Sequence, residues 1–452
     1  MKWVFLAILI SLIKPASAWL RKHPDKLSWP CFLIGFLPFV TGWLHLLTAP
    51  ISWAWIGHTK GLEIWVLDFI AIVILLFLRG KLTRPPFLIP MLLYFTTTVI
   101  ATFGAQVPEA SVFYCWQLLR VYLLYFAVAN VCTLEFSAVS SILTGLAMGE
   151  LLQCFISIWE RFRLHILQTP GTMESQNELG LVSHFVILPF FAIMLGGKRG
   201  WLPTAVVPAA LITYVLTTSR ASVLLGIVGL GLVWIMSSFT KFSVRKFGIV
   251  TGALMALMVM APLAVASFNA RFAHGGNLGL AEDTERLTFK RVVWMMLDDH
   301  PGGVGPNNFA VVANAGGYYN RSRDISSAGR SSNVHNLYLL VWAETGPLGV
   351  ASFILMLALP LVMALRFCLS GRWEAGDARR DILIGVSATL LILYVHSTEE
   401  WVPITAEMQY LLAIMFGLVV SLTAEQRGAK ARGRPIAGIR PSTVDPDLLL
   451  HH

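Results

Sequence analysis

Residues 221–238 read ASVLLGIVGLGLVWIMSS and contain no charged side chain. A run of this length and character predicts a helix that crosses a membrane, because about 20 residues of α-helix span the hydrocarbon core of a bilayer. The runs on either side of it, 201–217 and 246–266, have the same apolar character. The bilayer is therefore the expected solvent of this part of the chain.

The composition of the whole chain agrees with this prediction. Of its 452 residues, 56% are hydrophobic and only 13% are charged, whereas soluble domains carry about 25% charged residues. These proportions exclude an ordinary soluble enzyme and a disordered chain. The net charge of +9 does not indicate nucleic acid as a partner, because membrane proteins gather basic residues in their cytoplasmic connections.

Apolar runs long enough to cross a bilayer recur along the chain, and there are about 13 of them by the usual length of a span. They predict an all-α polytopic membrane protein with about 12–13 transmembrane helices. The expected spans are 3–20, 29–48, 62–79, 86–104, 111–131, 136–158, 179–196, 201–217, 221–238, 246–266, 338–366, 382–396 and 403–423.

Basic clusters fall on alternate connections between these spans and predict the orientation of the chain. The positive-inside rule makes their face cytoplasmic, while the opposite connections, such as 106–109 and 397–400, are acidic. The pattern predicts an outer N-terminus, a cytoplasmic C-terminus and an odd number of spans. The basic clusters are Arg21-Lys22 with Lys26, Arg79-Lys81-Arg84, Lys198-Arg199, Lys241-Arg245-Lys246, Arg372-Arg379-Arg380 and the tail from Arg427 to Arg440.

The first apolar run has a second interpretation. Met1-Lys2, the apolar stretch and Ala16-Ser17-Ala18 together resemble a secretory signal peptide with its cleavage site. Cleavage there would leave Arg21-Lys22 on the outer face, against the charge rule. We therefore favour a first helix that is retained.

Residues 267–337 interrupt the spans with a polar segment on the outer side. A connection of about 70 residues is unusual in a compact fold and is often functional. Within it, 284–299 predicts a short amphipathic helix over the membrane mouth. Its apolar side chains are Leu287, Val292, Trp294 and Met295. The chain thus divides into N-terminal transmembrane helices (1–266), this periplasmic loop (267–337), C-terminal transmembrane helices (338–423) and a basic cytoplasmic tail (424–452).

Arginines inside spans or on the outer face indicate function, because they are costly to place. Arg120 lies mid-span, where insertion scales give arginine a cost of about 2.5–3.5 kcal/mol. It is either the partner of a carboxylate such as Glu150 or Asp68, or a substrate contact. The outer arginines suggest an anionic ligand, since the guanidinium fork pairs well with phosphate, although snorkelling is the alternative for Arg220. These outer residues are Arg161, Arg163, Arg220, Arg286 and Arg291.

His335 lies where the polar segment re-enters the membrane. It is either a satisfied interfacial histidine or a base, since histidine titrates near neutral pH. Glu344, inside the next span, needs an arginine or histidine as partner. The run from Gly302 to Pro306 is expected to be a tight turn rather than a phosphate cradle, because no strand precedes it. Neither a metal nor a cofactor is expected, because no metal-ligand spacing is visible.

Four short motifs lie in a fixed order on the outer side of the membrane, within about 170–350. In order, spacing and side they resemble the O-antigen ligase and O-antigen polymerase superfamily, which are bacterial polytopic glycosyltransferases that use polyprenyl-diphosphate-linked glycans. The motifs are Gly171-Thr172-Met173 with Gln176 to Gly180; Thr218-Ser219-Arg220-Ala221-Ser222; Arg286-Leu287-Thr288-Phe289 with Asp299 to Phe309; and Val334-His335-Asn336-Leu337-Tyr338 with Glu344 to Gly349.

This resemblance implies a GT-C-like fold and an inverting, metal-independent glycan transfer. The donor would be an undecaprenyl-diphosphate-linked glycan, and the active face would be periplasmic, on the bacterial inner membrane. Arg220 and Arg286 match the family's functional arginines and His335 matches its essential histidine, so these three are the expected catalytic residues. The expected substrate-binding residues are Arg120, Arg161, Arg291, Asn177 and Asn336. The expected supporting residues are Glu344, Gly305, Gly346 and Gly349.

Related activities within this superfamily differ in their acceptor. A ligase transfers the glycan to lipid A-core, and a polymerase transfers it to a second lipid-linked glycan. Arg161 to Gly171 and Arg291 to Gly302 fit the loose Arg-x9/10-Gly spacing described for polymerases. We favour the ligase-type acceptor, with a protein O-oligosaccharyltransferase as a third member of the same group.

A transporter or flippase for a lipid-linked anion is the competing class, because it would also need buried arginines. Such proteins often contain paired, inverted halves with broken helices at matching positions, and the sequence shows no such halves. Its polar residues gather in one outer segment rather than at the midplane. We therefore expect an enzyme whose partners are membrane lipids, the glycan donor and a glycan acceptor, with no nucleic acid.

Overall fold

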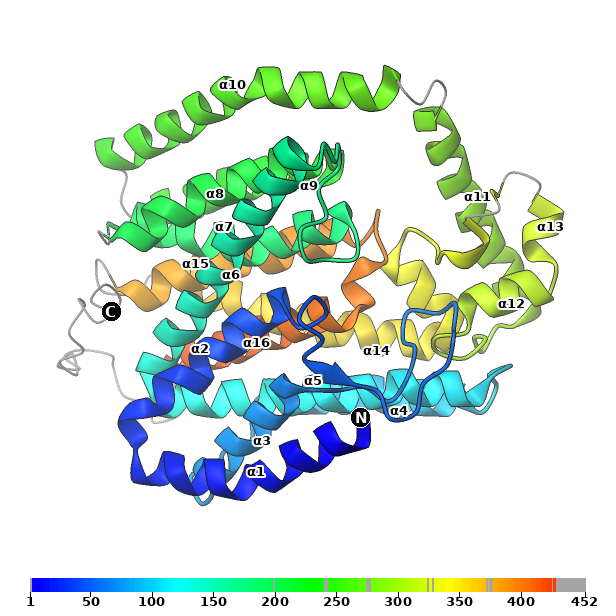
Figure 1. The fold of residues 1–452 in the computed structure, drawn as a ribbon, viewed down its shortest axis with the longest axis horizontal. Helices are drawn as coiled ribbons and strands as arrows, with labels where there is room; N and C mark the ends of the chain where they lie inside the picture. The colour runs from blue at the N-terminus through cyan, green and yellow to red at the C-terminus, as the bar shows by residue number, and fades with distance from the viewer. Residues whose placement is uncertain are drawn as a thin grey trace.

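The structure is a computed structural model that describes residues 2–197, 200–239, 243–273, 278–322, 325–326, 329–370, 373, 377–424 and 426–427. Helices dominate these residues, and many of them lie side by side (Figure 1). The predicted all-α class is therefore confirmed. Most of the expected cytoplasmic tail and parts of the basic clusters at 198–199, 241 and 372 lie outside the described residues.

The elements of the first part of the chain are mostly helical, with one small two-stranded sheet. They are α1 (Lys2–Lys22), the 3-10 helix η1 (Pro24–Leu27), α2 (Ser28–Phe36), η2 (Leu37–Phe39), β1 (Leu47–Thr48), β2 (Ile64–Trp65), α3 (Val66–Phe77), α4 (Leu88–Thr102), α5 (Pro108–Leu134) and α6 (Phe136–Arg163).

The second part of the chain continues with helices alone among its described residues. They are α7 (Gln176–Gly196), α8 (Trp201–Thr217), α9 (Arg220–Ser238), α10 (Val244–Ala273), α11 (Leu278–Asp299), α12 (Phe309–Ala315), α13 (Tyr318–Ser322), η3 (Gly329–Ser331), α14 (Leu337–Cys368), α15 (Ala378–His396), η4 (Val402–Ile404) and α16 (Ala406–Leu422).

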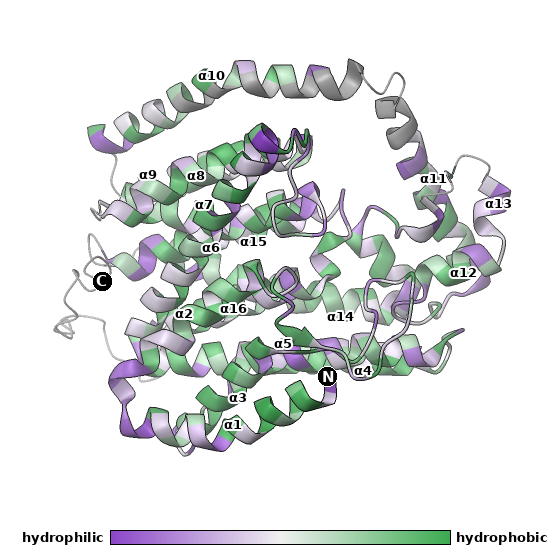
Figure 2. Ribbon diagram, in the orientation of Figure 1, coloured by the Kyte–Doolittle hydropathy of each residue, from purple (hydrophilic) through white to green (hydrophobic). Residues whose placement is uncertain are grey.

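Apolar helices of two lengths make up much of the bundle. Within the described residues, six helices are long and apolar enough to cross a membrane: α1, α5, α6, α7, α9 and α14. Four shorter apolar helices, α3, α4, α8 and α16, accompany them. Figure 2 shows hydrophobic residues along these helices and hydrophilic residues at many of their ends. The chain is therefore a multi-pass membrane protein.

The span expected over 29–48 differs from the structure. Helix α2 covers only Ser28–Phe36, and η2 follows it with Pro38 at its second position. Proline removes a backbone donor and restricts the helix that precedes it. Beyond this turn, Leu47 pairs with Trp65 in the small antiparallel sheet. An apolar run in this region is therefore divided between a short helix, a turn and a strand.

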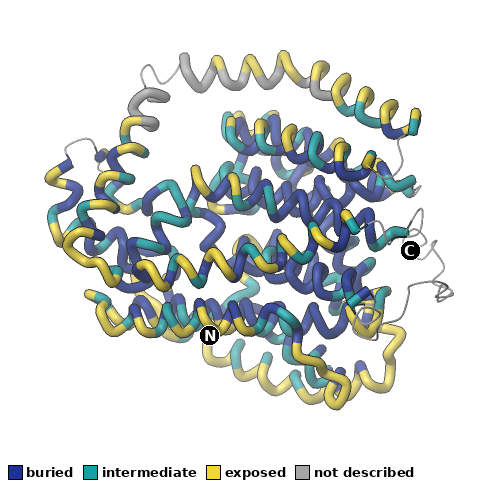
Figure 3. Tube along the Cα trace, turned by 180° about the vertical axis from the view of Figure 1, so that it is seen from behind, coloured by how far each residue is buried: buried dark blue, intermediate teal, exposed yellow. Residues whose placement is uncertain are grey.

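Small residues let the helices of the bundle approach closely. Gly35 in α2 and Gly145 in α6 face each other, and a Cβ on either would overlap the backbone of the other helix. In the same way Gly385 of α15 lies against the backbone of Pro189 in α7. Close packing through small residues is the usual basis of helix association in membranes. Figure 3 shows the buried interior that results, with the residues of α10 whose burial is described mostly exposed along one edge.

The polar segment lies at one end of the bundle, where α11, α12 and α13 gather (Figure 1). Helix α11 covers the stretch 284–299, where an amphipathic helix was expected, and ends at Asp299. Its buried stripe is Phe289, Val292, Val293 and Met296, a spacing that places them on one face. Leu287 and Trp294, which the sequence analysis assigned to the apolar face, are exposed.

Candidate active site

Three polar side chains from three separate segments meet at the carboxylate of Glu400. Its Oε2 lies 3.2 Å from Nδ1 of His335. Its Oε1 accepts hydrogen bonds from Nη2 of Arg286 at 3.1 Å and from Nδ2 of Asn177 at 2.9 Å. We call these four residues the mouth cluster. Three residues that the sequence analysis singled out on separate grounds therefore share one partner.

The position of His335 is fixed by the beginning of α14. Asn336 is the N-cap of this helix, and its side chain accepts a hydrogen bond from the N–H of Leu339 at 2.9 Å. Such a cap satisfies a backbone donor that the helix leaves unpaired. The same side chain donates to the carbonyl of Thr398 at 2.8 Å. The start of α14 is thereby joined to the segment after α15, which places His335 against Glu400.

The carboxylate at the centre of the mouth cluster is the most buried of its groups. The side chain of Glu400 is 4% exposed, compared with 27% for His335 and 30% for Arg286. Burial alone would raise the pKa of this carboxyl, but the hydrogen bond with His335 and the charge of Arg286 outweigh it and lower the pKa below its usual value. Glu400 is therefore ionised at neutral pH and anchors two groups that reach solvent.

His335 presents one ring nitrogen to this anchor. An ionised carboxylate only accepts hydrogen bonds, so Nδ1 of the imidazole carries the proton in its contact with Glu400. In the neutral ring the lone pair then lies on Nε2. The ring of Phe289 stands nearly edge-on to the imidazole, with 5.9 Å between centroids and 67° between planes. This tautomer suits His335 to accept a proton at Nε2.

Arg286 also contacts Glu399, the neighbour of its buried partner. Its Nη1 donates to the carbonyl oxygen of Glu399 at 3.2 Å and lies 3.6 Å from Oε2 of the same residue. The Glu399 side chain is 51% exposed, whereas that of Glu400 is held inside. The contact of Arg286 with the Glu399 carboxylate is therefore the exposed one of its two ion pairs.

Arg220 is the first residue of α9 and is exposed. The beginning of α9 packs on the beginning of α7, because a Cβ on Gly180 would lie 2.6 Å from the Cβ of Ser222. Helix α7 also contributes Asn177 to the mouth cluster. The structure therefore brings Arg220 to the same end of the bundle as the cluster, and its direct role in catalysis stays a prediction.

Arg120 lies in a second, separate cluster. Its side chain is 3% exposed, with Nε 3.4 Å from Oδ2 of Asp68 and Nη1 3.9 Å from Oε2 of Glu63. The rings of Trp65 and Tyr410 lie 5.7 Å and 5.6 Å from the guanidinium carbon. We call these five residues the Arg120 cluster. Pairing with Asp68 is one of the two roles expected for Arg120, and contact with substrate stays a prediction.

The other two arginines expected to bind substrate lie on different helices. Arg161, in the last turn of α6, donates from Nη1 to the carbonyl of Leu167 at 2.9 Å. It thereby ties the end of α6 to the connection that follows. Arg291 is exposed on α11, one to two turns beyond Arg286. Their expected contacts with an anion stay predictions.

Helix α14 is broken at Gly346, which has a φ of +69°. Pro347 follows and has no N–H, so the carbonyl of Ala343 lacks its helical partner four residues on. The N–H of Val304 takes that place and donates to this carbonyl at 2.9 Å. The turn at 302–306 therefore completes the hydrogen bonding of the broken helix.

Gly303 allows the turn to come this close to α14. Its φ is +90°, and a Cβ there would lie 2.6 Å from the carbonyl oxygen of Glu344. The same carbonyl accepts a hydrogen bond from the N–H of Gly305 at 2.9 Å. The expected tight turn is present, and two of its backbone donors are directed at α14 rather than at an open phosphate site.

The side chain of Glu344 adds further contacts between α14 and the segment that follows the turn. Its Oε1 accepts a hydrogen bond from the N–H of Phe309 at 3.1 Å, and its Oε2 lies 3.5 Å from Nε2 of His58. The histidine partner expected for this carboxylate thus comes from the connection between β1 and β2. Gly349 lies one turn beyond the break, where a Cβ would overlap the side chain of Thr345.

Sequence reasoning missed Glu400, the residue on which the mouth cluster converges. The acidic stretch Ser397 to Glu400 served only to orient the spans. A signal was present, because the chain has only 25 acidic residues among 452. An adjacent acidic pair at the end of an apolar run, on the side that carries the outer arginines, requires cationic partners.

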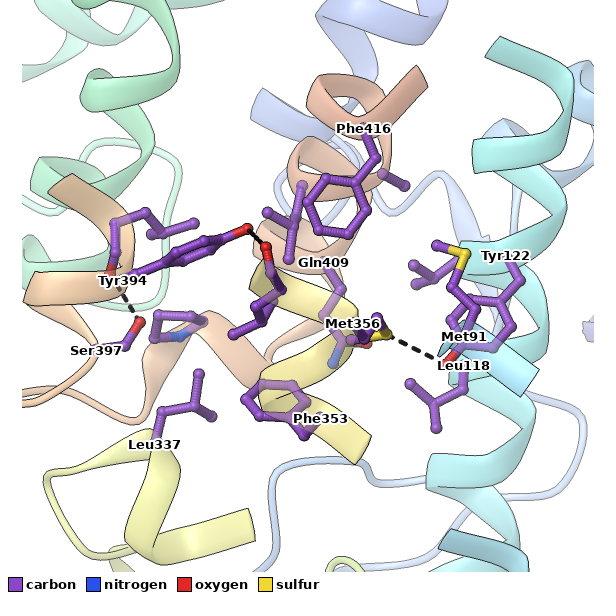
Figure 4. A pocket seen from close by; sticks show the side chains of 16 residues that line it. Met91, Leu118, Tyr122, Leu337, Phe353, Met356, Tyr394, Ser397, Gln409 and Phe416 are labelled. Carbon is purple, nitrogen blue, oxygen red and sulfur yellow. Dashed lines mark hydrogen bonds between the residues drawn. The ribbon is translucent and has the colours of Figure 1, made fainter. Parts of the chain in front are cut away.

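An apolar cavity lies next to the mouth cluster, and Figure 4 shows its lining. Leu337 and Ser397, close in sequence to His335 and Glu400, form part of its wall. The residues that line the cavity are mostly apolar, so the polar cluster is the better candidate for the site of chemistry.

The fold and the mouth cluster together define a multi-pass membrane protein with a histidine–carboxylate pair and an arginine at one end of its bundle. Residues 204–354, about a third of the chain, match the model of the family described as O-antigen ligase. This match confirms the resemblance to the O-antigen ligase and polymerase superfamily, whose members are membrane glycosyltransferases. The matched segment contains Arg286 and His335, while Asn177 and Glu400 lie outside it. No curated protein matches the chain.

Proposed function

We propose that this protein transfers a glycan from undecaprenyl diphosphate to an acceptor hydroxyl, with inversion, at the periplasmic face of the bacterial inner membrane. The observation that carries the proposal is the His335–Glu400 pair beside Arg286, at the end of a membrane-spanning bundle. Lipid A-core is the acceptor in an O-antigen ligase. A second lipid-linked glycan as acceptor would make the same chemistry a polymerase reaction.

His335 acts as the base in this mechanism. As the acceptor oxygen bonds to the anomeric carbon, its proton passes to Nε2 of His335, and general-base catalysis of this kind contributes about 10²–10⁴-fold. The imidazolium that forms keeps its Nδ1–H directed at Glu400. A buried, ionised carboxylate in this place stabilises the new positive charge and holds the ring in its working tautomer.

The leaving group is the lipid diphosphate. The bond between the anomeric carbon and the diphosphate oxygen breaks, and its electron pair goes to that oxygen. Arg286 and Arg220 are suited to neutralise the developing charge, because guanidinium groups form paired, charge-assisted bonds with phosphate oxygens. Arg286 would exchange its exposed contact with Glu399 for the diphosphate and keep Glu400 as its anchor.

The test is a transfer assay with purified protein in lipid and an undecaprenyl-diphosphate-linked oligosaccharide. Lipid A-core and a second lipid-linked repeat are offered as separate acceptors. We expect transfer by the native protein and its loss in His335→Ala, while His23→Ala, at an exposed histidine near the end of α1, retains it. Product on lipid A-core identifies a ligase, and a ladder of longer lipid-linked chains identifies a polymerase.

Failure of transfer has a definite meaning in this assay. If the native protein binds the donor and transfers nothing to either acceptor, both the ligase and the polymerase proposals are wrong. A protein acceptor and a flux assay in the same proteoliposomes would then be examined. If His335→Ala retains native transfer, the assignment of this histidine as base is wrong even though the activity stands.

A further inference from the structure

A chain of buried polar side chains lies behind the mouth cluster and takes no part in the mechanism above. Nδ1 of His184 in α7 lies 2.5 Å from the hydroxyl of Tyr214 in α8. Nε2 of the same histidine lies 3.3 Å from Nδ1 of His396, the last residue of α15. His184 and His396 have no exposed surface, and Tyr214 is 3% exposed. The three side chains form one hydrogen-bonded line.

This line ends beside Glu400. His396 precedes Glu400 by about one helical turn, and its carbonyl accepts a hydrogen bond from the N–H of Glu399 at 2.9 Å. The charges of Glu400 and Arg286 both act on the His396 ring. The mouth cluster and the buried line are therefore electrostatically connected.

Polar side chains of this kind are costly inside membrane helices and are often functional. Within the described part of the chain, Nδ1 and Nε2 of His184 and Nδ1 of His396 have hydrogen-bond partners. Nε2 of His396, in contrast, has no hydrogen-bond partner among the described residues. Nε2 of His396 is therefore the one ring nitrogen of the two histidines that is left unpaired among the described residues, and its ring is the one on which the charge of Glu400 acts.

The bonds of the line can run in two directions. In the first, Tyr214 donates to Nδ1 of His184, Nε2–H of His184 donates to Nδ1 of His396, and Nε2 of His396 carries a proton. In the second, Nδ1–H of His184 donates to the hydroxyl of Tyr214, and Nδ1–H of His396 donates to Nε2 of His184. The hydroxyl proton of Tyr214 is then left without a partner, and Nε2 of His396 presents a lone pair.

The surroundings of the two ends favour the first direction. The Tyr214 ring packs on Gly226 of α9, where a Cβ would lie 2.6 Å from the ring. This is a poor place for an unpaired hydroxyl proton, because a buried donor without a partner is costly. At the other end, the negative charge of Glu400 acts on the His396 ring and favours an N–H over a lone pair on the unpaired nitrogen. The proton is therefore better placed on Nε2 of His396.

We propose that Tyr214 and His184 fix the tautomer of His396, so that the proton on its Nε2 faces the mouth cluster and supports the ionised Glu400. His396 is a positioning residue, because it acts on the reaction through Glu400 and His335. The inference rests on the proposed function, since the group it ultimately orients is the proposed base. It adds Tyr214, His184 and His396 to the residues on which transfer depends.

The first test reads the tautomers directly and needs no activity. Protein labelled with 15N-histidine is placed in bilayers, and the ring nitrogen shifts of His184 and His396 are assigned by comparison with single variants. We expect Nε2–H in both rings and a mixture of tautomers in His184 when Tyr214→Phe removes the donor. Nδ1–H in both rings of the native protein would overturn the proposal.

The second test compares two substitutions at position 396 in the transfer assay. The amide nitrogen of glutamine reaches the place of Nε2, whereas that of asparagine reaches the place of Nδ1. We expect His396→Gln to retain transfer and His396→Asn to lower kcat about tenfold with KM unchanged, as second-layer partners of catalytic groups often do. Equal losses in the two variants would show a packing role alone and contradict the proposal.

The two tests separate this inference from the proposed function. Native protein that transfers glycan but shows Nδ1–H in both rings contradicts only the inference. Native protein that transfers nothing contradicts the proposed function, and the histidine tautomers are then still measured in the same sample. The amount of folded protein, followed by size-exclusion chromatography, serves as the control for every variant.

Discussion

The mouth cluster and the Arg120 cluster have similar chemistry and different surroundings. In each, the arginine contacts two carboxylates: Asp68 and Glu63 for Arg120, and Glu400 and Glu399 for Arg286. The Arg120 side chain is 3% exposed and lies beneath two aromatic rings. The Arg286 side chain is 30% exposed and shares its buried carboxylate with His335. The described residues therefore bury the Arg120 guanidinium almost completely, whereas the mouth cluster is partly exposed at the end of the bundle.

The comparison shows that the cost of burying an arginine does not by itself indicate a catalytic role. The ion pairs of Arg120 with Asp68 and Glu63 offset the cost of its burial, and ion pairs of this kind hold neighbouring segments of the bundle together. Arg286 keeps part of its guanidinium accessible and lies beside a titratable group. We therefore expect the Arg120 cluster to determine folding and the mouth cluster to determine catalysis.

The largest effect is expected from Glu400→Gln. The amide of glutamine can donate to Nδ1 of His335, which would move the ring proton to Nε2 and remove the base. Loss of a correctly oriented base lowers rates by about 10²–10⁴-fold, so we expect kcat for glycan transfer to fall within this range. Thermal unfolding in detergent should change little, because the amide remains hydrogen-bonded.

The matched control for this change is the adjacent residue. Glu399→Gln alters charge to the same extent, but the Glu399 side chain is 51% exposed and its ion pair is with Arg286 rather than with His335. It should keep kcat near the native value. If both variants lose kcat equally, net charge at the mouth matters and the specific pair does not.

Arg120→Met should act on stability instead. It leaves Asp68 and Glu63 without their cation in the interior, and breaking a buried ion pair from one side costs about 3–5 kcal/mol. We expect a large loss of unfolding free energy, partly recovered in the double variant with Asp68→Asn because the two sites are coupled. Fully folded Arg120→Met protein without transfer would instead support the substrate contact expected for Arg120.

A smaller effect on stability is expected where the turn at 302–306 contacts α14. Gly303 has a φ of +90° and backbone of Glu344 within 2.6 Å of any Cβ, so Gly303→Ala should destabilise by about 1–3 kcal/mol. The matched control is Gly302→Ala, because nothing lies within 4 Å of a Cβ there. Equal unfolding temperatures for the two variants would show that the turn accommodates a Cβ at position 303 without loss of stability.

The helical spans were predictable where an apolar run is continuous and sharply bounded. Runs 201–217 and 221–238 correspond closely to α8 (Trp201–Thr217) and α9 (Arg220–Ser238). The run at 29–48 failed because hydropathy is the same in a short helix, a turn and a strand. Whether the chain turns after Phe36 depends on Pro38 and on pairing with β2, which lies far along the sequence.

The candidate site was predictable residue by residue but not as a group. His335, Arg286 and Asn177 each stood out in the sequence, yet their common partner did not. His335 and Glu400 are separated by 65 residues, and Asn177 and Glu400 by 223. Hydrophobic periodicity specifies which face of a helix is buried. It does not specify which helix ends, far apart in the sequence, lie next to each other. That pairing is set by the topology of the bundle.

The smallest effect is expected where the mouth cluster opens to solvent. Glu399 competes with an incoming diphosphate for Arg286, and exposed ion pairs contribute about 0.2–1 kcal/mol. Glu399→Gln should therefore lower KM for the donor by about two- to threefold, with kcat unchanged because Glu400 still holds Arg286. Asp25→Asn, which removes an exposed ion pair with Lys26 within η1, should leave KM as it is. An unchanged KM in Glu399→Gln would mean that the diphosphate does not displace this carboxylate from Arg286.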